Sequence, residues 1–194
     1  SSSNLLMMAS LTSKRGYNFP KGTKVLMPIA GFPTTLNPTL QMGFTPVFVD
    51  IELDTLNLDL DQVERVLSND PDIRIITFAH VLGNPPNMNK LMELVNKYNL
   101  ILLEDCCDAL GTTYKGVPCG THGVMATCSF YPAHHMTMGE GGFVACENEE
   151  LEKIKNFISI TFPFPCYLPH FQSPSYFLPS AHRYTKNFNY FFKG

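Results

Sequence analysis

Three features are missing from this sequence of 194 residues, and each absence removes a class of protein. Basic residues are not in surplus: 14 Lys and Arg against 17 Asp and Glu give a net charge of −3, which argues against a general nucleic-acid binder. No apolar run is long and uninterrupted enough to span a bilayer. The opening residues, SSSNLLMMASLTSKRG, lack the order of a secretory signal and an initiator Met, so we expect a fragment whose true N-terminus is missing.

What is present is typical of a globular protein, with 44% hydrophobic and 16% charged residues. The six cysteines are scattered, and several lie in apolar runs that resemble strands. This distribution favours buried, reduced thiols over a disulfide framework. We therefore predict an intracellular, cytoplasmic protein.

Short apolar segments alternate with amphipathic ones along most of the chain. Strands are expected within residues 24–32, 45–52, 73–81, 100–107, 123–133 and 141–147, and helices within 4–15, 33–43, 58–70, 88–99 and 148–158. This alternation predicts βαβ units and hence a three-layer α/β fold, in which helices cover both faces of a mostly parallel sheet. The chain has no G-x-G-x-x-G dinucleotide fingerprint.

The character of the sequence changes after about residue 157. Residues 158–194 contain five prolines, many aromatic residues and almost no acidic ones. Prolines at this spacing exclude a regular helix or a central strand. The segment could be an extended arm that lies on a partner, or a tail unrelated to the domain. We favour the second interpretation and divide the chain into a domain of residues 1–157 and a divergent tail of residues 158–194.

Candidate site residues follow strands, because ligands of open α/β sheets bind at the carboxyl ends of parallel strands. Phe32, Asp105 and the loop that begins at Ser129 occupy such positions. Asp105 ends the apolar run LILLED, where an unpaired carboxylate is costly, so we expect a cationic partner rather than a simple helix cap.

His134 belongs to the same loop. A single histidine is more often an ordinary core residue than a ligand, but His134 is accompanied by Ser129, by His135 and by a Gly-Glu-Gly-Gly turn. From the residues alone, this loop indicates a ligand site, for which an anionic ligand is one possibility.

Four blocks of this sequence resemble, in order and spacing, the DegT/DnrJ/EryC1/StrS family of sugar-aminotransferase-like proteins, which use pyridoxal or pyridoxamine phosphate (PLP or PMP). The blocks are KVLMPIAGFPTT, PVFVDIELDTLNLD, LLEDCCDALGTTYKG and GTHGVMATCSFYPAHHMTMGEGG. The resemblance covers residues 1 to about 157 and implies part of the large domain of a PLP-dependent transferase fold, similar to that of aspartate aminotransferase. It is closest to the subgroup with two adjacent histidines, the iron–sulfur CDP-4-keto-6-deoxyglucose 3-dehydratases of dideoxysugar and lipopolysaccharide biosynthesis.

In ordinary members of this family, a lysine at the position of His134 bonds covalently to the cofactor aldehyde. An imidazole cannot form that bond, but it accepts and delivers protons near neutral pH because its unperturbed pKa is about 6.5. The resemblance therefore implies that PMP is held noncovalently. It also implies that His134 is the base in a dehydration that removes the C3 hydroxyl of a nucleotide-linked 4-keto-6-deoxyhexose. His135 is either a second polar contact or a structural residue.

The resemblance assigns further cofactor contacts. Asp105 would bind the protonated pyridine nitrogen, and Phe32 would stack on the ring. Ser129 and Ser1 would contact the phosphate, next to a helix N-terminus whose amides favour an anion.

Cys107 matches one cysteine ligand of the [2Fe–2S] cluster in the iron–sulfur subgroup. Downstream of the histidine loop the subgroup has three more, whereas this chain has only Cys166 among prolines, so it lacks the usual set of four thiolates. The alternative is that Cys106 and Cys107 are buried small hydrophobic residues.

The implied partners are a nucleotide sugar, with CDP favoured, a second subunit in a full-length homodimer, and an NADH-dependent reductase. Two alternatives remain open. One is an enzyme similar to GDP-4-keto-6-deoxymannose 3-dehydratase, which works without iron. The other is an inactive fragment of such an enzyme.

Overall fold

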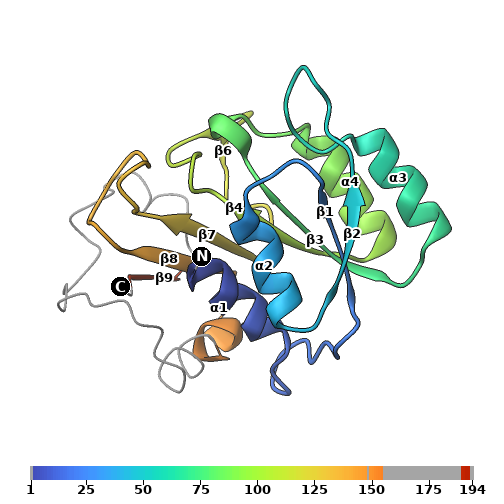
Figure 1. Ribbon diagram of the computed structural model, residues 1–194, viewed down its shortest axis with the longest axis horizontal. Helices are drawn as coiled ribbons and strands as arrows, with labels where there is room; N and C mark the ends of the chain where they lie inside the picture. Colours follow the sequence, from blue (N-terminus) through green and yellow to red (C-terminus); the bar gives the residue numbers. More distant parts are fainter. Residues whose placement is uncertain (1, 148, 155–188, 193–194) are drawn as a thin grey trace.

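Helices cover both faces of one twisted sheet in the computed structural model, which describes residues 2–147, 149–154 and the backbone of 189–192 (Figure 1). The central strands are β1 (Lys24–Pro28), β2 (Thr45–Val49), β3 (Ile73–Ala79), β4 (Ile101–Asp105), β7 (Met125–Ser129), β8 (Gly142–Cys146) and β9 (Asn189–Phe192). The helices are α1 (Ser2–Leu11), α2 (Pro33–Gln41), α3 (Leu60–Asn69) and α4 (Met88–Tyr98), followed by a short helix at residues 149–154. The predicted three-layer α/β fold is confirmed.

The sheet has the strand order β2-β1-β3-β4-β7-β8-β9. The first five of these strands run parallel to their neighbours, whereas β8 pairs antiparallel with β7, and β9 with β8. The carboxyl ends of β1, β3, β4 and β7 therefore lie along one edge of the sheet. The connection between β3 and α4 contains a 3-10 turn, η1 (Val81–Gly83). The connection between β4 and β7 contains a two-stranded hairpin of β5 (Thr113–Tyr114) and β6 (Val117–Pro118).

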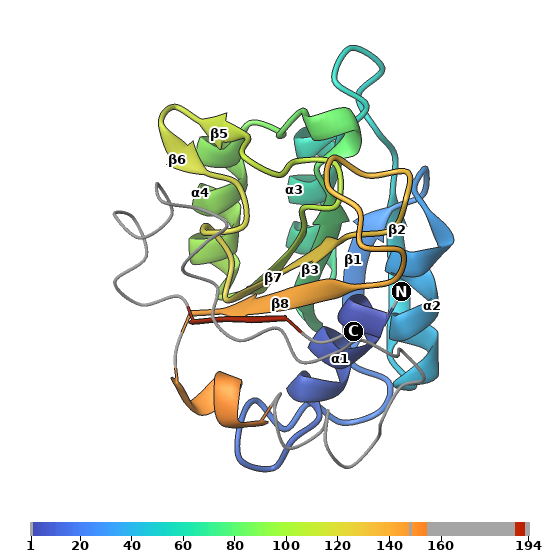
Figure 2. The same ribbon diagram turned by 90° about the vertical axis from the view of Figure 1, so that its left-hand side faces the viewer.

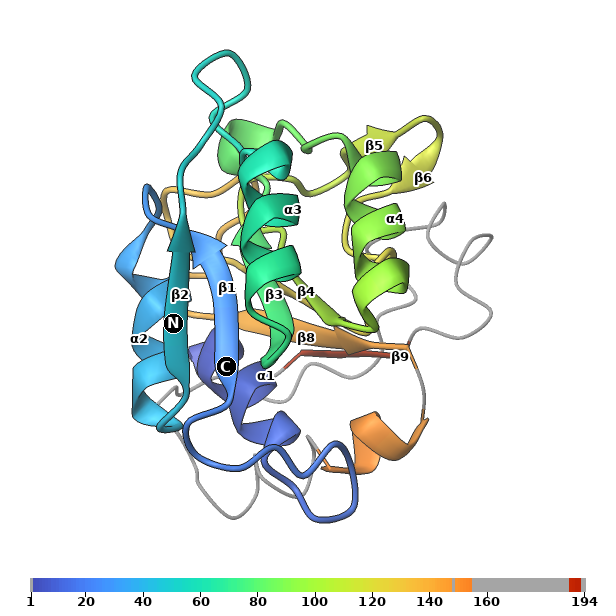
Figure 3. The ribbon, with the colours of Figure 1, turned by 90° about the vertical axis from the view of Figure 1, so that its right-hand side faces the viewer.

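Each face of the sheet has its own apolar core. Helices α3 and α4 lie side by side over one face, and α1 and α2 lie over the other (Figures 2 and 3). The first core includes Val63 and Leu67 of α3 and Leu91 and Leu94 of α4, all buried against the strands. The second core is built around α1, and its buried members include Met7, Met8 and Leu11.

The helix boundaries follow the capping chemistry of the sequence. Asp59 precedes α3, and its side chain accepts hydrogen bonds from the backbone N–H groups of Asp61 and Gln62. Asn87 caps α4 in the same way, and Asn99 ends that helix in the left-handed conformation. Helix α1 ends at Leu11, four residues before the expected end, and a series of turns follows it.

The tail is described only at β9, an edge strand that the sequence analysis did not predict. The proposed domain boundary near residue 157 and the rest of residues 158–188 lie outside the described part of the chain and stay predictions. Among the helices that are described, none has the length and apolar character needed to cross a membrane.

Candidate active site

Polar side chains gather where β4 and β7 end. These strands are neighbours, and Asp105 at the end of β4 lies opposite Thr127, two residues before Ser129 ends β7. The backbone N–H of His80, which directly follows β3, donates to the carbonyl oxygen of Asp105 at 3.0 Å. The fold thus brings the ends of β3, β4 and β7 together at the edge where ligands of parallel sheets bind.

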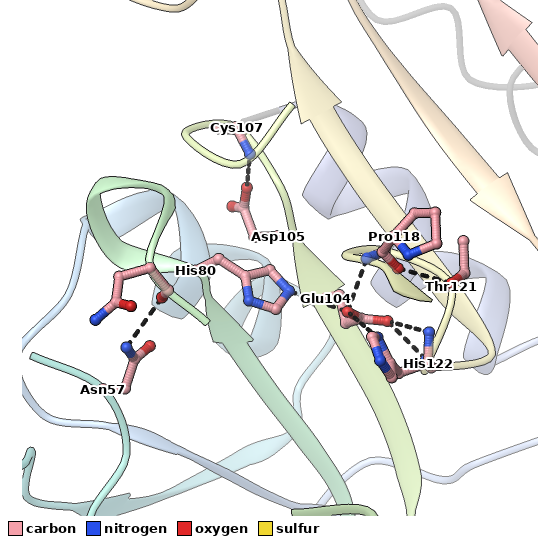
Figure 4. Close-up of polar contacts among 11 residues, drawn as sticks. Asn57, His80, Glu104, Asp105, Cys107, Pro118, Thr121 and His122 are labelled. Carbon is pink, nitrogen blue, oxygen red and sulfur yellow. Dashed lines mark hydrogen bonds and ion pairs between the residues drawn. The ribbon is translucent and has the colours of Figure 1, made fainter. Parts of the chain in front are cut away.

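Asp105 is a buried carboxylate, with 5% of its surface exposed. Its Oδ2 accepts a hydrogen bond from Nδ2 of Asn4 at 2.8 Å. Its Oδ1 accepts one from the backbone N–H of Cys107 at 3.0 Å (Figure 4). Both partners are neutral N–H groups. In the part of the chain that the structure describes, no Lys, Arg or His forms an ion pair with Asp105, so no protein group there provides the cationic partner that we expected.

His134 and His135 have different surroundings although they are adjacent. The His134 side chain is 22% exposed, and its Nδ1 lies 3.1 Å from Oδ1 of Asp108. An ionised carboxylate only accepts hydrogen bonds, so Nδ1 is the nitrogen that carries a proton in the neutral form of this imidazole, and Nε2 is the one with the lone pair. His135 is exposed to solvent. Of the two imidazoles, the geometry thus orients that of His134 through a carboxylate at Nδ1.

Phe32 and Ser129 lie at the start of α2 and the end of β7. Phe32 is the N-cap residue of α2 and is 72% exposed, an unusual environment for a large apolar ring. Ser129 pairs in register with Gly142, and a Cβ on Gly142 would come within 2.6 Å of Oγ of Ser3 in the first turn of α1. Ser129 therefore lies close to the N-terminus of α1. Ser1 lies outside the described residues, and the phosphate contacts of both serines stay predictions.

The cysteines near this edge are neutral thiols. Burial and the charge of Asp105 raise the pKa of the Cys107 thiol well above its usual range. Burial likewise raises the pKa of Cys119 to about 11 and that of Cys128 to about 12. Cys107 is not a member of the one group of possible metal ligands found among the described residues. Cys166 lies outside them, so the cluster-ligand role of Cys107 stays a prediction.

Glu104 is a buried acid that the sequence analysis missed. It precedes Asp105 in β4, has no exposed surface and accepts four hydrogen bonds. Three come from backbone N–H groups of the loop at residues 120–123, and the fourth comes from Nε2 of His80 at 3.0 Å (Figure 4). The signal was available, because the argument that singled out Asp105 in its apolar run applies equally to Glu104.

Comparison with known proteins decides the family. The sequence profile of the DegT/DnrJ/EryC1/StrS aminotransferase family matches residues 1–161. The chain belongs to this family. The lipopolysaccharide biosynthesis protein RfbH of Salmonella typhimurium is 50% identical to it over 156 residues, which are 79% of this chain and 35% of that protein. The dTDP-4-dehydro-2,6-dideoxy-D-glucose 3-dehydratase of Saccharopolyspora spinosa is 45% identical over 156 residues, which are 79% of this chain and 33% of that enzyme.

Solved structures of the family share the fold. The GDP-4-keto-6-deoxy-D-mannose 3-dehydratase of Escherichia coli with bound hydrated PLP superposes with a TM-score of 0.75 at 31% identity, covering 82% of this chain and 39% of that one. The family predicted from the four sequence blocks is therefore confirmed. The chain spans about a third to two fifths of the length of these relatives.

Proposed function

We propose that this chain forms part of the coenzyme site of a PMP-dependent dehydratase, which removes the C3 hydroxyl of a nucleotide-linked 4-keto-6-deoxyhexose. The observation that carries this proposal is the His134 imidazole, which the Asp108 carboxylate holds and which, by family resemblance, takes the place of the lysine of ordinary members. Three relatives bear the name of 3-dehydratases, which supports the reaction class.

The residues at the edge of the sheet where the parallel strands have their carboxyl ends fit PMP. Asp105 is a buried carboxylate without a cationic partner among the described residues, and a protonated pyridine nitrogen would supply the missing positive charge. The exposed ring of Phe32 offers an apolar face on which a second ring can stack. Ser129 lies beside the first turn of α1, where a hydroxyl and helix amides favour a phosphate dianion.

The protein would contribute placement and a proton carrier. When bound, PMP supplies an amine that can condense with the sugar ketone and a ring that accepts electrons. His134 would accept a proton at Nε2, because Nδ1 is already occupied by its hydrogen bond to Asp108. The same carboxylate would stabilise the imidazolium that results, which lets His134 return the proton later in the cycle.

The degree of similarity favours a pyrimidine nucleotide on the sugar. The relative that acts on a dTDP-linked sugar is 45% identical to this chain, whereas the GDP-linked 3-dehydratase of Escherichia coli is 33% identical. We keep CDP as the favoured nucleotide and the GDP-linked enzyme as the second candidate. The homodimer, the NADH-dependent reductase and a [2Fe–2S] cluster at Cys107 belong to the same proposal and rest on family resemblance alone.

The histidine base can be tested by proton exchange at the C4′ methylene of PMP, followed by NMR in deuterated buffer. We expect His134→Asn to slow this exchange at least ~100-fold, the usual contribution of a general base, while PMP affinity stays the same. His135→Asn is the matched control, because it removes the adjacent, exposed imidazole and should leave both quantities unchanged.

Three results would count against the proposal in different ways. Persistent exchange in His134→Asn would show that another group is the base. Covalent fixation of PLP by borohydride would show that a lysine of this chain reaches the cofactor aldehyde. Failure of the wild-type chain to bind PMP would support the inactive-fragment alternative.

A further inference from the structure

Asn4 uses all of its side-chain hydrogen-bonding groups inside the protein. It lies in the first turn of α1 and is 5% exposed. Its Nδ2 donates to Oδ2 of Asp105 at 2.8 Å and to the carbonyl oxygen of Thr34 at 3.0 Å. Its Oδ1 accepts from Oγ1 of Thr127 at 2.5 Å. A fully bonded buried amide of this kind has one fixed orientation.

The chemistry of the partners settles that orientation. The Asp105 carboxylate and the Thr34 carbonyl can only accept hydrogen bonds, so the nitrogen of the Asn4 amide must face both. The oxygen must then face the hydroxyl of Thr127, which has a proton to donate. An amide turned the other way would place an oxygen against two acceptors and a nitrogen donor against the hydroxyl.

The three partners come from three different parts of the proposed coenzyme site. Thr34 lies two residues after Phe32, at the start of α2. Thr127 lies two residues before Ser129, in β7. Asp105 is the residue that would meet the pyridine nitrogen. One amide from α1 therefore joins the elements that carry the ring-stacking residue, the phosphate contact and the carboxylate.

We propose that Asn4 is a positioning residue for the coenzyme. It would keep Asp105 in one orientation as the residue that holds the ring nitrogen, and it ties α2 and β7 to that carboxylate. This inference rests on the proposed PMP function. It assigns a role to a side chain that need not touch the coenzyme.

The test compares PMP labelled with ¹⁵N at the ring nitrogen in the wild-type chain and in Asn4→Leu, which has a similar volume and none of the three hydrogen bonds. The ¹⁵N chemical shift reports whether the ring nitrogen is protonated and bonded to a carboxylate. In the wild type we expect the shift of a pyridinium. In Asn4→Leu we expect a shift toward that of neutral pyridine and a PMP affinity ~10- to 100-fold weaker, the loss typical of a hydrogen bond to a charged group.

Asn57→Leu is the matched control. Asn57 is another buried asparagine, and its Nδ2 donates to the carbonyl oxygens of Thr55 and Asn84, away from Asp105. Its replacement also removes buried amide bonds, but we expect the ¹⁵N shift and the PMP affinity to stay at their wild-type values. If Asn4→Leu does not fold, Asn4→Ala removes the same three hydrogen bonds without adding a charge or a larger side chain, and the same change is expected.

The outcomes separate the two proposals. A wild-type chain that binds PMP as a pyridinium, together with an unchanged shift and affinity in Asn4→Leu or Asn4→Ala, would overturn the role of Asn4 and leave the proposed function intact. A wild-type chain that does not bind PMP, or binds it with a neutral ring nitrogen, would overturn the proposed function and this inference with it.

Discussion

Replacing Glu104 by Gln tests whether this buried acid fastens the loop at residues 120–123 to the sheet. Glu104 accepts backbone N–H groups from Gly120, His122 and Gly123 at 2.6–2.8 Å, and Nε2 of His80 at 3.0 Å. Glutamine has nearly the same shape but only one oxygen. Its NH₂ group must therefore face two of the four groups that now donate to Glu104.

The expected loss of stability follows from the donors that remain. His80 can change its tautomer and accept from the new NH₂ group, but a backbone N–H cannot, so at least one buried donor becomes unpaired. An orphaned N–H costs about 1–3 kcal/mol, and the bonds that remain lose the contribution of the carboxylate charge. We expect Glu104→Gln to lower the free energy of unfolding by about 3–5 kcal/mol, a large share of the stability of a typical domain.

Urea unfolding followed by circular dichroism would measure this change. The control is Glu64→Gln, because Glu64 pairs with Lys97 at 2.7 Å on the surface, where both side chains are about half exposed. An exposed pair of this kind contributes at most about 1 kcal/mol. A loss in Glu104→Gln no larger than in Glu64→Gln would refute the reasoning.

The pH dependence of the unfolding free energy gives an independent test of whether the ionised Glu104 carboxylate stabilises the fold. Burial alone would raise the pKa of Glu104, but hydrogen bonds from His122 and His80 hold it well below its usual range. A carboxylate with a lowered pKa stabilises the fold above its unfolded value of about 4.3, and this contribution is lost as the pH falls toward the folded value. The difference in unfolding free energy between the wild type and Glu104→Gln should therefore shrink as the pH falls below about 4.

Three further predictions concern other residues. Asp108→Ala removes the acceptor at Nδ1 of His134, so C4′ exchange of PMP should slow by about 10-fold with little change in PMP affinity; an unchanged NMR exchange rate would contradict the positioning of His134 by Asp108. Iodoacetamide at pH 8 should leave Cys119 and Cys128 unlabelled in the folded chain, since their pKa values are about 11 and about 12, and mass spectrometry would reveal rapid labelling if this is wrong. Asp59→Ala removes the N-cap of α3 and should lower the unfolding free energy by about 1 kcal/mol in urea titrations, and no measurable loss would show that the cap does not stabilise the fold.

The sequence predicted those features that depend on local pattern. Strands and helices alternate as expected, because the apolar period changes from one segment to the next. Asp105 stood out because a carboxylate in an apolar run is costly wherever the chain folds. The position of His134 came from family resemblance, because no local rule distinguishes a basic imidazole from a core histidine.

Features that depend on distant contacts could not be predicted in the same way. Asn4 looked like a polar residue at the start of a helix, and its partners Asp105 and Thr127 follow 101 and 123 residues later in the sequence. The antiparallel direction of β8 could have been predicted from the sequence. Residues 130–141 contain no helix, and a parallel crossover usually requires one. Strand β9 had no comparable signal, because its pairing with β8 depends on residues far apart in the sequence.

Glu104 and Asp105 show why adjacent acids in one strand can have different capacities for a ligand. Successive side chains of β4 point to opposite faces, so Glu104 meets the loop at residues 120–123 and Asp105 meets α1. A carboxylate has about four acceptor sites, and Glu104 uses all of them on protein donors.

The one possible metal group among the described residues consists of His80, Glu104 and Cys106, whose ligand atoms lie within 4.8 Å of one another. A metal ion there would have to displace Nε2 of His80 and the N–H of Gly120 from the same carboxylate oxygen. Asp105, by contrast, is bonded only by Asn4 and Cys107 among the described residues, and none of these donors is a cation. The capacity for a cationic ligand at this edge therefore resides in Asp105 rather than in Glu104.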